Sequence, residues 1–369
     1  MDLALTDTQR VLRDSVRQFV QQEAATGTLT ELDSSAKSWE PGWLPTLAAT
    51  GWLGVFVPES LGGADASAMD AAVLLEELGR GPVPGPVLPS SVVAALLLRA
   101  SAATPERDEL LQGIGAGTSI VIPALREAGT SWRGAGSAGA NPGADGQLSC
   151  TKVFVACAAA ATHFLVSLSC DDAGRSRFAV VPADAAGVRI RLLTGFLHAS
   201  YEVDFAAARV TTILTGPEAS ELDASLAPGL VGLAAYQAGG CAAVLDMSIR
   251  WSNTREQFGN PIGRFQRVQD HIVRILNATD AARWTAYEAA WAVDTGQEAG
   301  PARAHLAAAV ASDSYLEAAN AGHEVHAGIG SDPKFGLTLY TRQSRTLFDF
   351  LGSPDWHRAR MAEQLGWML

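Results

Sequence analysis

The chain has 369 residues, of which 48% are hydrophobic and 18% are charged, and its formal net charge is −12. This composition is typical of a globular protein, and at roughly 150 residues per domain the length predicts two or three domains. The acidic balance argues against nucleic acid or an anionic membrane as a partner, because both require a basic surface.

The cysteines and the apolar segments indicate the compartment. No Cys-x-x-Cys pair and no histidine at metal-ligand spacing accompany Cys150, Cys157, Cys170 and Cys241, which favours free thiols and predicts no metal site. We recognise no basic leader with an apolar core and no uninterrupted apolar run long enough to cross a bilayer. We therefore expect a soluble cytoplasmic protein without membrane insertion.

The first 118 residues are predicted to be helical. Thr6 and Gln9 have the spacing of a capping box, and the residues that follow place an apolar set on one helical face, namely Leu12, Val16, Phe19 and Val20. Apolar periodicity predicts a second helix over 68–80, which the Gly- and Pro-containing segment 79–86 ends. A further apolar segment covers 91–100.

A change of pattern near Ser119 predicts a middle β-domain. Short β-type runs, separated by Gly, Asp, Asn and Ala-rich turns, occur at 119–122, 148–155, 164–168, 178–181, 188–192 and 202–205. Strands at this spacing are typical of a small β-barrel or sandwich. The glycine-rich stretch 133–146 predicts a flexible loop between strands.

Helical periodicity returns after Pro228. The Pro-free intervals 229–260, 262–300 and 302–332 are each long enough for several turns, and turn residues bound each of them. Three long helices and a shorter terminal one predict an antiparallel four-helix bundle. The expected fold is mainly α with a β middle domain: an N-terminal helical domain over 1–118, a β-domain over 119–224 and a helical bundle over 225–369.

The segment 255–270 joins the first two of these long helices. It reads Arg-Glu-Gln-Phe-Gly-Asn-Pro-Ile-Gly-Arg-Phe-Gln-Arg-Val-Gln-Asp. Its Asn-Pro-Ile-Gly core is a turn signal, because Pro261 cannot donate in a helix and Gly263 tolerates unusual backbone angles. The polar and aromatic residues around this turn predict an anion-binding and hydrogen-bonding cluster.

This segment closely resembles the Arg-x-Gln-Phe-Gly-x-Pro-Ile-Gly-x-Phe-Gln-x-x-Gln signature of the flavin-dependent acyl-CoA dehydrogenases. The resemblance implies FAD as the cofactor and an acyl-CoA thioester as the substrate. It also implies that Arg255 reaches the FAD diphosphate of a neighbouring subunit, where a planar guanidinium suits paired phosphate oxygens, and that Phe258 and Gln266 contact the cofactor. The segments 51–63 and 75–81 also look like the N-terminal domain of this family, and the order helical, β, helical covers almost the whole chain.

A second segment, 323–330, reads His-Glu-Val-His-Ala-Gly-Ile-Gly and resembles the Gln-Val-His-Gly-Gly-Ile-Gly turn of the same family. The resemblance places His326 and Gly328 at the adenosine end of FAD. Glu324 replaces the family's glutamine, and a carboxylate facing a diphosphate is unfavourable. Ala327 replaces the first glycine of the turn.

The carboxylate that removes the substrate α-proton in this family is not found at its usual positions. Leu351 stands where one such glutamate would lie, Tyr236 stands at a second position, and a third falls near Gly229. In the middle domain, 125–130 and 153–157 replace the Thr-Glu-Pro-Gly-x-Gly-Ser-Asp and Trp-Ile-Thr phrases, so hydroxyls expected to bond the flavin ring are missing.

Three interpretations follow from the resemblance. In the first, the chain is the subunit of an α2β2 hetero-oligomer that lacks the base and contributes FAD contacts to a partner with the catalytic glutamate, as in the actinobacterial enzymes for steroid side-chain CoA esters. In the second, it is a self-sufficient homo-oligomer that uses a non-standard acid or base, with Asp349, Tyr236 and Asp246 as candidates. In the third, it is a scaffold of the same fold without flavin.

Overall fold

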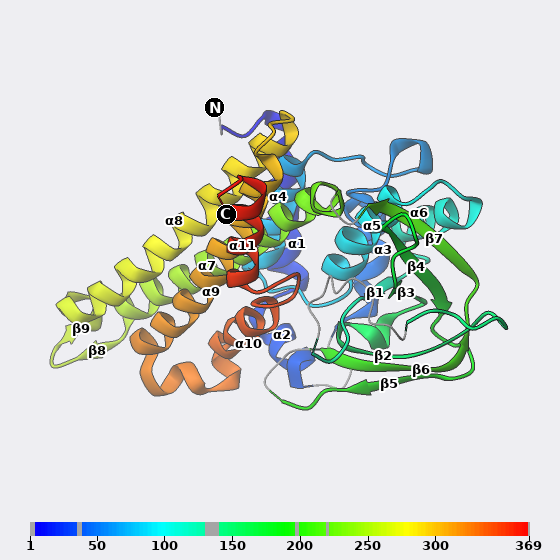
Figure 1. Cartoon of the computed structure of the whole chain (residues 1–369). Helices are drawn as coiled ribbons and strands as arrows, with labels where there is room; N and C mark the ends of the chain where they lie inside the picture. Colours follow the sequence, from blue (N-terminus) through cyan, green and yellow to red (C-terminus); the bar gives the residue numbers. More distant parts are fainter. Residues whose placement is uncertain (1–3, 35–38, 130–139, 196–198, 219–220, 368–369) are drawn as a thin grey trace. The chain divides into compact units, whose positions relative to one another are not determined.

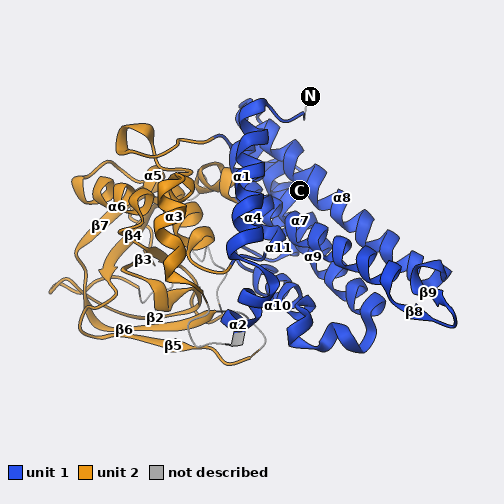
Figure 2. Cartoon of the chain, turned by 180° about the vertical axis from the view of Figure 1, so that it is seen from behind, with its two compact units in different colours: residues 1–38, 67–83, 230–369 blue, residues 39–66, 84–229 orange. Residues whose placement is uncertain are grey.

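The computed structural model describes residues 4–34, 39–129, 140–195, 199–218 and 221–367 (Figure 1). The chain forms two compact units (Figure 2). Unit 1 contains residues 1–38, 67–83 and 230–369, and unit 2 contains residues 39–66 and 84–229.

Long helices dominate unit 1. The helices of unit 1 are α1 (Asp7–Glu23), α2 (Thr26–Ser34), α4 (Ala68–Arg80), α7 (Leu222–Thr254, whose residues 222–229 belong to unit 2), α8 (Gln266–Asp294), α9 (Gly300–His326), α10 (Leu337–Leu347) and α11 (Pro354–Gln364). The capping box that begins α1 is confirmed, and α4 has the predicted bounds. The three long helices predicted for the bundle are found, but two short helices follow them instead of one.

The predicted start of the first bundle helix is wrong. Helix α7 begins at Leu222 and continues through Pro228. A proline inside a helix removes one backbone hydrogen bond, and burial of the apolar residues around it offsets that loss.

Helix α7 is also long and apolar enough to cross a membrane, contrary to the expectation from the sequence. However, 83% of its most apolar 18-residue window is buried, as in the core helix of a globular protein.

Helices α4 and α7 cross with their backbones in contact. A Cβ on Gly79 would lie 1.9 Å from the carbonyl oxygen of Tyr236, and a Cβ on Gly239 would lie 1.9 Å from that of Glu76. Gly240 faces the opposite way, and a Cβ there would lie 2.4 Å from the ring of Tyr315 on α9. The glycine pair 239–240 therefore lets α7 approach α4 and α9 at once.

Unit 2 contains the β-domain. Its strands are β1 (Val121–Ala124), β2 (Gln147–Ala156), β3 (His163–Leu168), β4 (Arg175–Pro182), β5 (Val188–Leu192), β6 (Ser200–Arg209) and β7 (Thr212–Glu218). The six predicted strands are found, and β7, which contains Gly216 and Pro217, was not predicted. Of the predicted loop 133–146, residues 133–139 lie outside the described residues.

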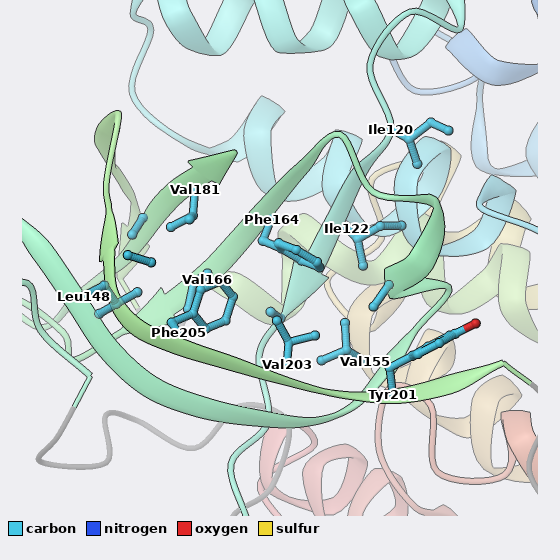
Figure 3. Packing of buried hydrophobic residues seen from close by; sticks show 14 of the residues in the cluster. Ile120, Ile122, Leu148, Val155, Phe164, Val166, Val181, Tyr201, Val203 and Phe205 are labelled. Carbon is cyan, nitrogen blue, oxygen red and sulfur yellow. The ribbon is translucent and has the colours of Figure 1, made fainter. Parts of the chain in front are cut away.

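Two sheets enclose one hydrophobic core, as predicted for a sandwich. One sheet has the order β1-β3-β4-β7, with β1 and β3 parallel, and the other has the order β2-β6-β5 and is antiparallel. Buried side chains of both sheets, including Val166 of β3 and Val203 of β6, form a single cluster (Figure 3). Phe164 and Phe205 meet edge to face across it, with ring centroids 5.6 Å apart.

Short helices complete unit 2. They are α3 (Leu44–Ala49), α5 (Ala95–Ala100) and α6 (Pro105–Ala116), and a π-helical segment, Val87–Ala94, leads into α5. The segment predicted as apolar at 91–100 is therefore helical, but α6 was missed. Thr104 caps α6 by accepting from the N–H of Arg107, and Pro105 occupies its first turn.

Candidate functional site

The segment after α7 is a small β-hairpin. Strands β8 (Glu256–Gln257) and β9 (Asn260–Pro261) pair antiparallel, and Figure 2 shows the hairpin at the end of α7 and α8 within unit 1. Phe258 and Gly259 form its tip, both with positive φ (53° and 75°), as a two-residue type I′ turn requires. The tip therefore precedes the Asn-Pro-Ile-Gly core from which the turn was predicted, and Pro261 lies in a strand.

Arg255 lies between α7 and this hairpin. Its N–H donates to the carbonyl of Trp251 at 2.8 Å, and its own carbonyl accepts from the N–H of Ile262 at 2.8 Å. The side chain is exposed, and its guanidinium lies 6.0 Å from the centroid of the Trp251 indole. Within the described residues it forms no ion pair, so it is available to an anion from outside the chain.

The other predicted residues of this segment are exposed as well. Phe258 is 90% exposed at the tip and meets the ring of Phe265 edge to face at 6.1 Å. Gln266 is the first residue of α8 and is exposed, whereas Gln269 donates its amide N–H to the carbonyl of Gly263 at 2.9 Å. Gln269 therefore holds the loop, and Gln266 is the glutamine open to a ligand.

The second segment forms the turn at the end of α9. Ala327 adopts φ 51° and ψ −137°, a conformation that favours glycine, which the resembled family has at this position. A Cβ added to Gly328 would meet nothing within 4 Å, whereas one on Gly330 would lie 3.0 Å from Leu337 and 3.1 Å from His326. Within this chain Gly330 is required for packing, and the backbone at Gly328 is open to a ligand.

His326 lies under this turn rather than on its surface. It is 2% exposed, and its Nδ1 lies 2.7 Å from the carbonyl oxygen of Gly322, to which it donates. Burial lowers the pKa of the imidazole, although the Gly322 carbonyl partly offsets this effect. The neutral ring therefore supports the turn through packing.

An aromatic cluster joins the two predicted segments. The indole of Trp251 stacks on His326 with centroids 6.0 Å apart, and Phe335 packs against both rings. Because Arg255 lies over the same indole, the arginine and the glycine turn are held in one place. Neither aromatic was predicted, although Trp251 precedes Arg255 by one helical turn, a spacing at which side chains meet.

The residues considered as a base have other partners. Tyr236 is 2% exposed, its hydroxyl donates to the carbonyl of Val83 at 3.1 Å, and it accepts from the amide of Gln343 at 3.3 Å. Asp246 pairs with Arg80 at 2.7 Å. Asp349 is half-buried in the turn after α10.

Two of the positions where the family carries its glutamate are apolar and buried. Leu351 is 3% exposed, and a Cβ on the buried Gly229 would lie 2.9 Å from Leu96. Neither residue offers a proton acceptor in its side chain. The geometry thus provides no free carboxylate at these positions.

Residues of the middle-domain segments 125–130 and 153–157 make contacts within unit 2. The guanidinium of Arg126 lies 5.1 Å from the ring centroid of Phe154, and Glu127 pairs with the buried Lys152 at 2.8 Å. Cys157 donates its thiol to the carbonyl of Gly85 at 3.3 Å, and burial raises its pKa to about 12. Thr130 lies outside the described residues.

The Glu-Glu-Leu-Gly-Arg run of α4 connects α4 to three other helices, a role that the sequence pattern did not indicate. Glu76 pairs with Arg283 of α8 at 2.7 Å, and Glu77 pairs with Arg17 of α1 at 2.7 Å. Arg80 pairs with Asp246 of α7. These ion pairs tie α7 and α8, which carry the hairpin, to α4.

The N- and C-terminal regions match known protein families. Residues 6–118 match the family described as acyl-CoA dehydrogenase, N-terminal domain, and residues 221–366 match acyl-CoA dehydrogenase, C-terminal domain. The chain is similar to acyl-CoA dehydrogenase FadE34 of Mycobacterium tuberculosis, with 29% identity over 97% of this chain and 48% of FadE34. It is also similar to FadE28 of the same organism, with 28% identity over 92% of this chain and 96% of FadE28. The chain thus spans about half the length of FadE34.

Solved structures share the fold along the whole chain. A variant of the Tcur3481-Tcur3483 steroid ACAD is 28% identical, covers 98% of both chains and has a TM-score of 0.83. Butyryl-CoA dehydrogenase from Megasphaera elsdenii is 21% identical, covers 99% of this chain and all of its own, and has a TM-score of 0.85.

Proposed function

Since this chain belongs to the acyl-CoA dehydrogenase family, and is therefore an FAD-dependent oxidoreductase of that type, we propose that it works as one subunit of a hetero-oligomeric acyl-CoA dehydrogenase. In this assembly it contributes contacts to the FAD of a partner subunit, and the partner carries the catalytic glutamate. The substrate is a bulky acyl-CoA ester, such as that of a steroid side chain.

The exposed Arg255 carries this proposal. Its guanidinium has no ion pair within the described residues, lies beside the exposed tip of a hairpin and is oriented by Trp251. Such an arginine leaves its bidentate hydrogen-bonding edge available for a diphosphate. Because the hairpin extends from the ends of α7 and α8, its ligand lies outside the chain's own core.

The residues around Arg255 fit the adenosine diphosphate part of FAD. Gln266 offers an amide at the start of α8, Phe258 offers an exposed ring, and the backbone at Gly328 leaves room for close approach. Glu324 is exposed in the last turn of α9. Its carboxylate would repel a phosphate, so we assign it no direct contact with FAD. FAD, when bound, accepts the hydride from the β-carbon of the thioester; this chain's residues hold and orient its diphosphate end.

Two of the three candidate bases, Tyr236 and Asp246, are already engaged, which supports the role of a partner. A general base has to reach the proton that it removes, and Tyr236 donates its own proton to a backbone carbonyl while Asp246 is neutralised by Arg80. A partner subunit with a glutamate completes the reaction. The similarity to the Tcur3481-Tcur3483 steroid ACAD supports both the two-chain arrangement and the class of substrate.

A self-sufficient enzyme is the second candidate, because Asp349 lies half-buried in the loop between α10 and α11, where one of the family's glutamate positions falls. In that case Asp349 would take the α-proton.

We propose the cytoplasm as the location for either form, since the four cysteines are free thiols.

Turnover by the isolated chain separates these candidates. The chain expressed alone should show little acyl-CoA oxidation with an artificial electron acceptor. Co-expressed with an acyl-CoA dehydrogenase subunit that has the glutamate, it should form a flavin-bearing complex whose activity is lost when that glutamate becomes glutamine. Asp349→Asn in this chain should cost far less. Robust turnover by the isolated chain that Asp349→Asn abolishes would establish the self-sufficient enzyme instead.

A further inference from the structure

Helix α8 has a stripe of large apolar side chains on its outer surface. Val273 is 52% exposed, Leu276 is 42% exposed and Trp284 is 51% exposed. At about 100° per residue, these three positions fall within an arc of roughly 80° on the helix. A row of exposed large apolar side chains along one helix face marks an interaction surface more often than scattered apolar residues do.

The stripe is continuous with the hairpin. Gln266 lies on the same side of α8, because it precedes Trp284 by five turns of the helix. At a rise of 1.5 Å per residue, the face from Gln266 to Trp284 is about 27 Å long. A subunit that receives Arg255 and Gln266 therefore has this face of α8 next to it.

One acidic residue lies inside the stripe. Asp280 falls between Leu276 and Trp284 on the same face and is exposed. Within the described residues it forms no ion pair, although the guanidinium of Arg283, three residues further along α8, attracts it; that guanidinium is bound to Glu76 at 2.7 Å. Covering this face with apolar atoms alone would remove the water that hydrogen-bonds to the carboxylate and would give the carboxylate no new hydrogen-bonding partner.

We propose that this face, the α8 stripe (Val273, Leu276, Asp280 and Trp284), docks the partner subunit, and that the partner is a different chain with a basic residue opposite Asp280. This inference rests on the proposed function, which requires a neighbour at the hairpin. Trp284 is the apolar anchor of the interface, since large aromatic side chains dominate binding energy. Asp280 sets the choice of partner.

Charge decides between a different chain and a second copy. Two copies related by a twofold axis present the same patch to each other. If the two α8 helices are parallel, each Asp280 faces the Asp280 of the other copy. If they are antiparallel and centred on the stripe, each Asp280 is offset by three residues from its copy, which is about 4.5 Å along the helix axis. With helix axes about 8–10 Å apart, the carboxylates repel each other inside an apolar contact.

Self-association of the purified chain tests this choice. Asp280→Asn removes the repulsion. In sedimentation velocity, the Kd of self-association should therefore be at least about tenfold lower for this variant than for the unaltered chain. Trp284→Ala added to this variant should abolish the gain. Glu298→Gln, a matched change at an exposed acid outside the stripe, should have no effect. An unaltered chain that forms a dimer through Trp284, or an Asp280→Asn variant that associates no more tightly, would overturn the inference.

Co-expression with the glutamate-bearing subunit tests the surface itself. Trp284→Ala and Asp280→Lys should each reduce co-purification about tenfold or more, whereas Trp367→Ala, a more exposed tryptophan at 69%, should not. A complex that tolerates both stripe variants would refute the docking surface. If the stripe variants dissociate the complex while Arg255→Ala leaves its flavin content unchanged, the interface stands and the flavin contact by Arg255 fails.

Discussion

Trp251 of α7 stacks on His326 of α9, with their rings 6.0 Å apart and inclined by 24°. This contact joins the hairpin that begins at Arg255 to the glycine turn that follows His326. Because the guanidinium of Arg255 lies over the same indole, the positions of both segments depend on one aromatic ring. A ligand contact at either segment is therefore sensitive to the packing of Trp251.

Replacing Arg255 should weaken flavin retention in the assembled complex. Arg255→Lys loses the bidentate geometry, and Arg255→Ala should cost about 1.5–3 kcal/mol, the contribution of a hydrogen bond to a charged group. Flavin absorbance after gel filtration measures the effect. Arg267→Ala, at an exposed arginine on α8, is the control and should retain flavin. Equal flavin content in all variants would remove Arg255 from the site.

Two glycines of the turn should respond differently to alanine. Gly328→Ala meets nothing within 4 Å inside the chain, so thermal stability should be unchanged while flavin retention falls. Gly330→Ala places a methyl group 3.0 Å from Leu337 and should lower stability by about 1–3 kcal/mol through overpacking. Thermal unfolding and flavin absorbance measure the two effects. A flavin content unaffected by Gly328→Ala would show that no ligand approaches there.

Gly239→Ala should disrupt unit 1. Its methyl group would lie 1.9 Å from the backbone oxygen of Glu76, so α4 and α7 would have to separate, at a cost of at least about 3 kcal/mol. Gly27→Ala is the matched control, since Gly27 lies exposed in α2 with nothing within 4 Å and alanine favours helices. Denaturant unfolding compares the two. A Gly239→Ala variant as stable as the control would contradict the close crossing.

Stability should fall in mild acid partly through His326. The unfolded chain protonates this histidine near pH 6.5, and burial lowers its pKa in the folded chain. Its contribution is therefore complete above about pH 6.5 and is lost as the pH falls towards the lower folded pKa. His326→Asn should reduce the difference between the unfolding free energies at about pH 7.5 and about pH 5.5. An unchanged difference would assign the acid sensitivity to other groups.

Local signals predicted much of the fold. The capping box that begins α1 involves residues three positions apart, the bounds of α4 follow from its apolar periodicity, and α8 and α9 begin near prolines. Strand β7 was missed because it contains Gly216 and Pro217, which are turn residues in most contexts. They lie at a register shift, and the flanking residues Thr215 and Glu218 pair with β4 and keep the segment in the sheet. Non-local pairing overrode local preference there.

The sequence by itself determined the family resemblance and the order of helical and β segments, because these depend on neighbours a few positions apart. Only the tertiary structure decided that Tyr236 donates to Val83, that Trp251 supports both Arg255 and His326, and that α4 packs on α7 through Gly239. These contacts join residues far apart in the chain, so their geometry depends on how the helices cross. The crossing is set by small residues and buried ion pairs, which have no periodic signal in the sequence.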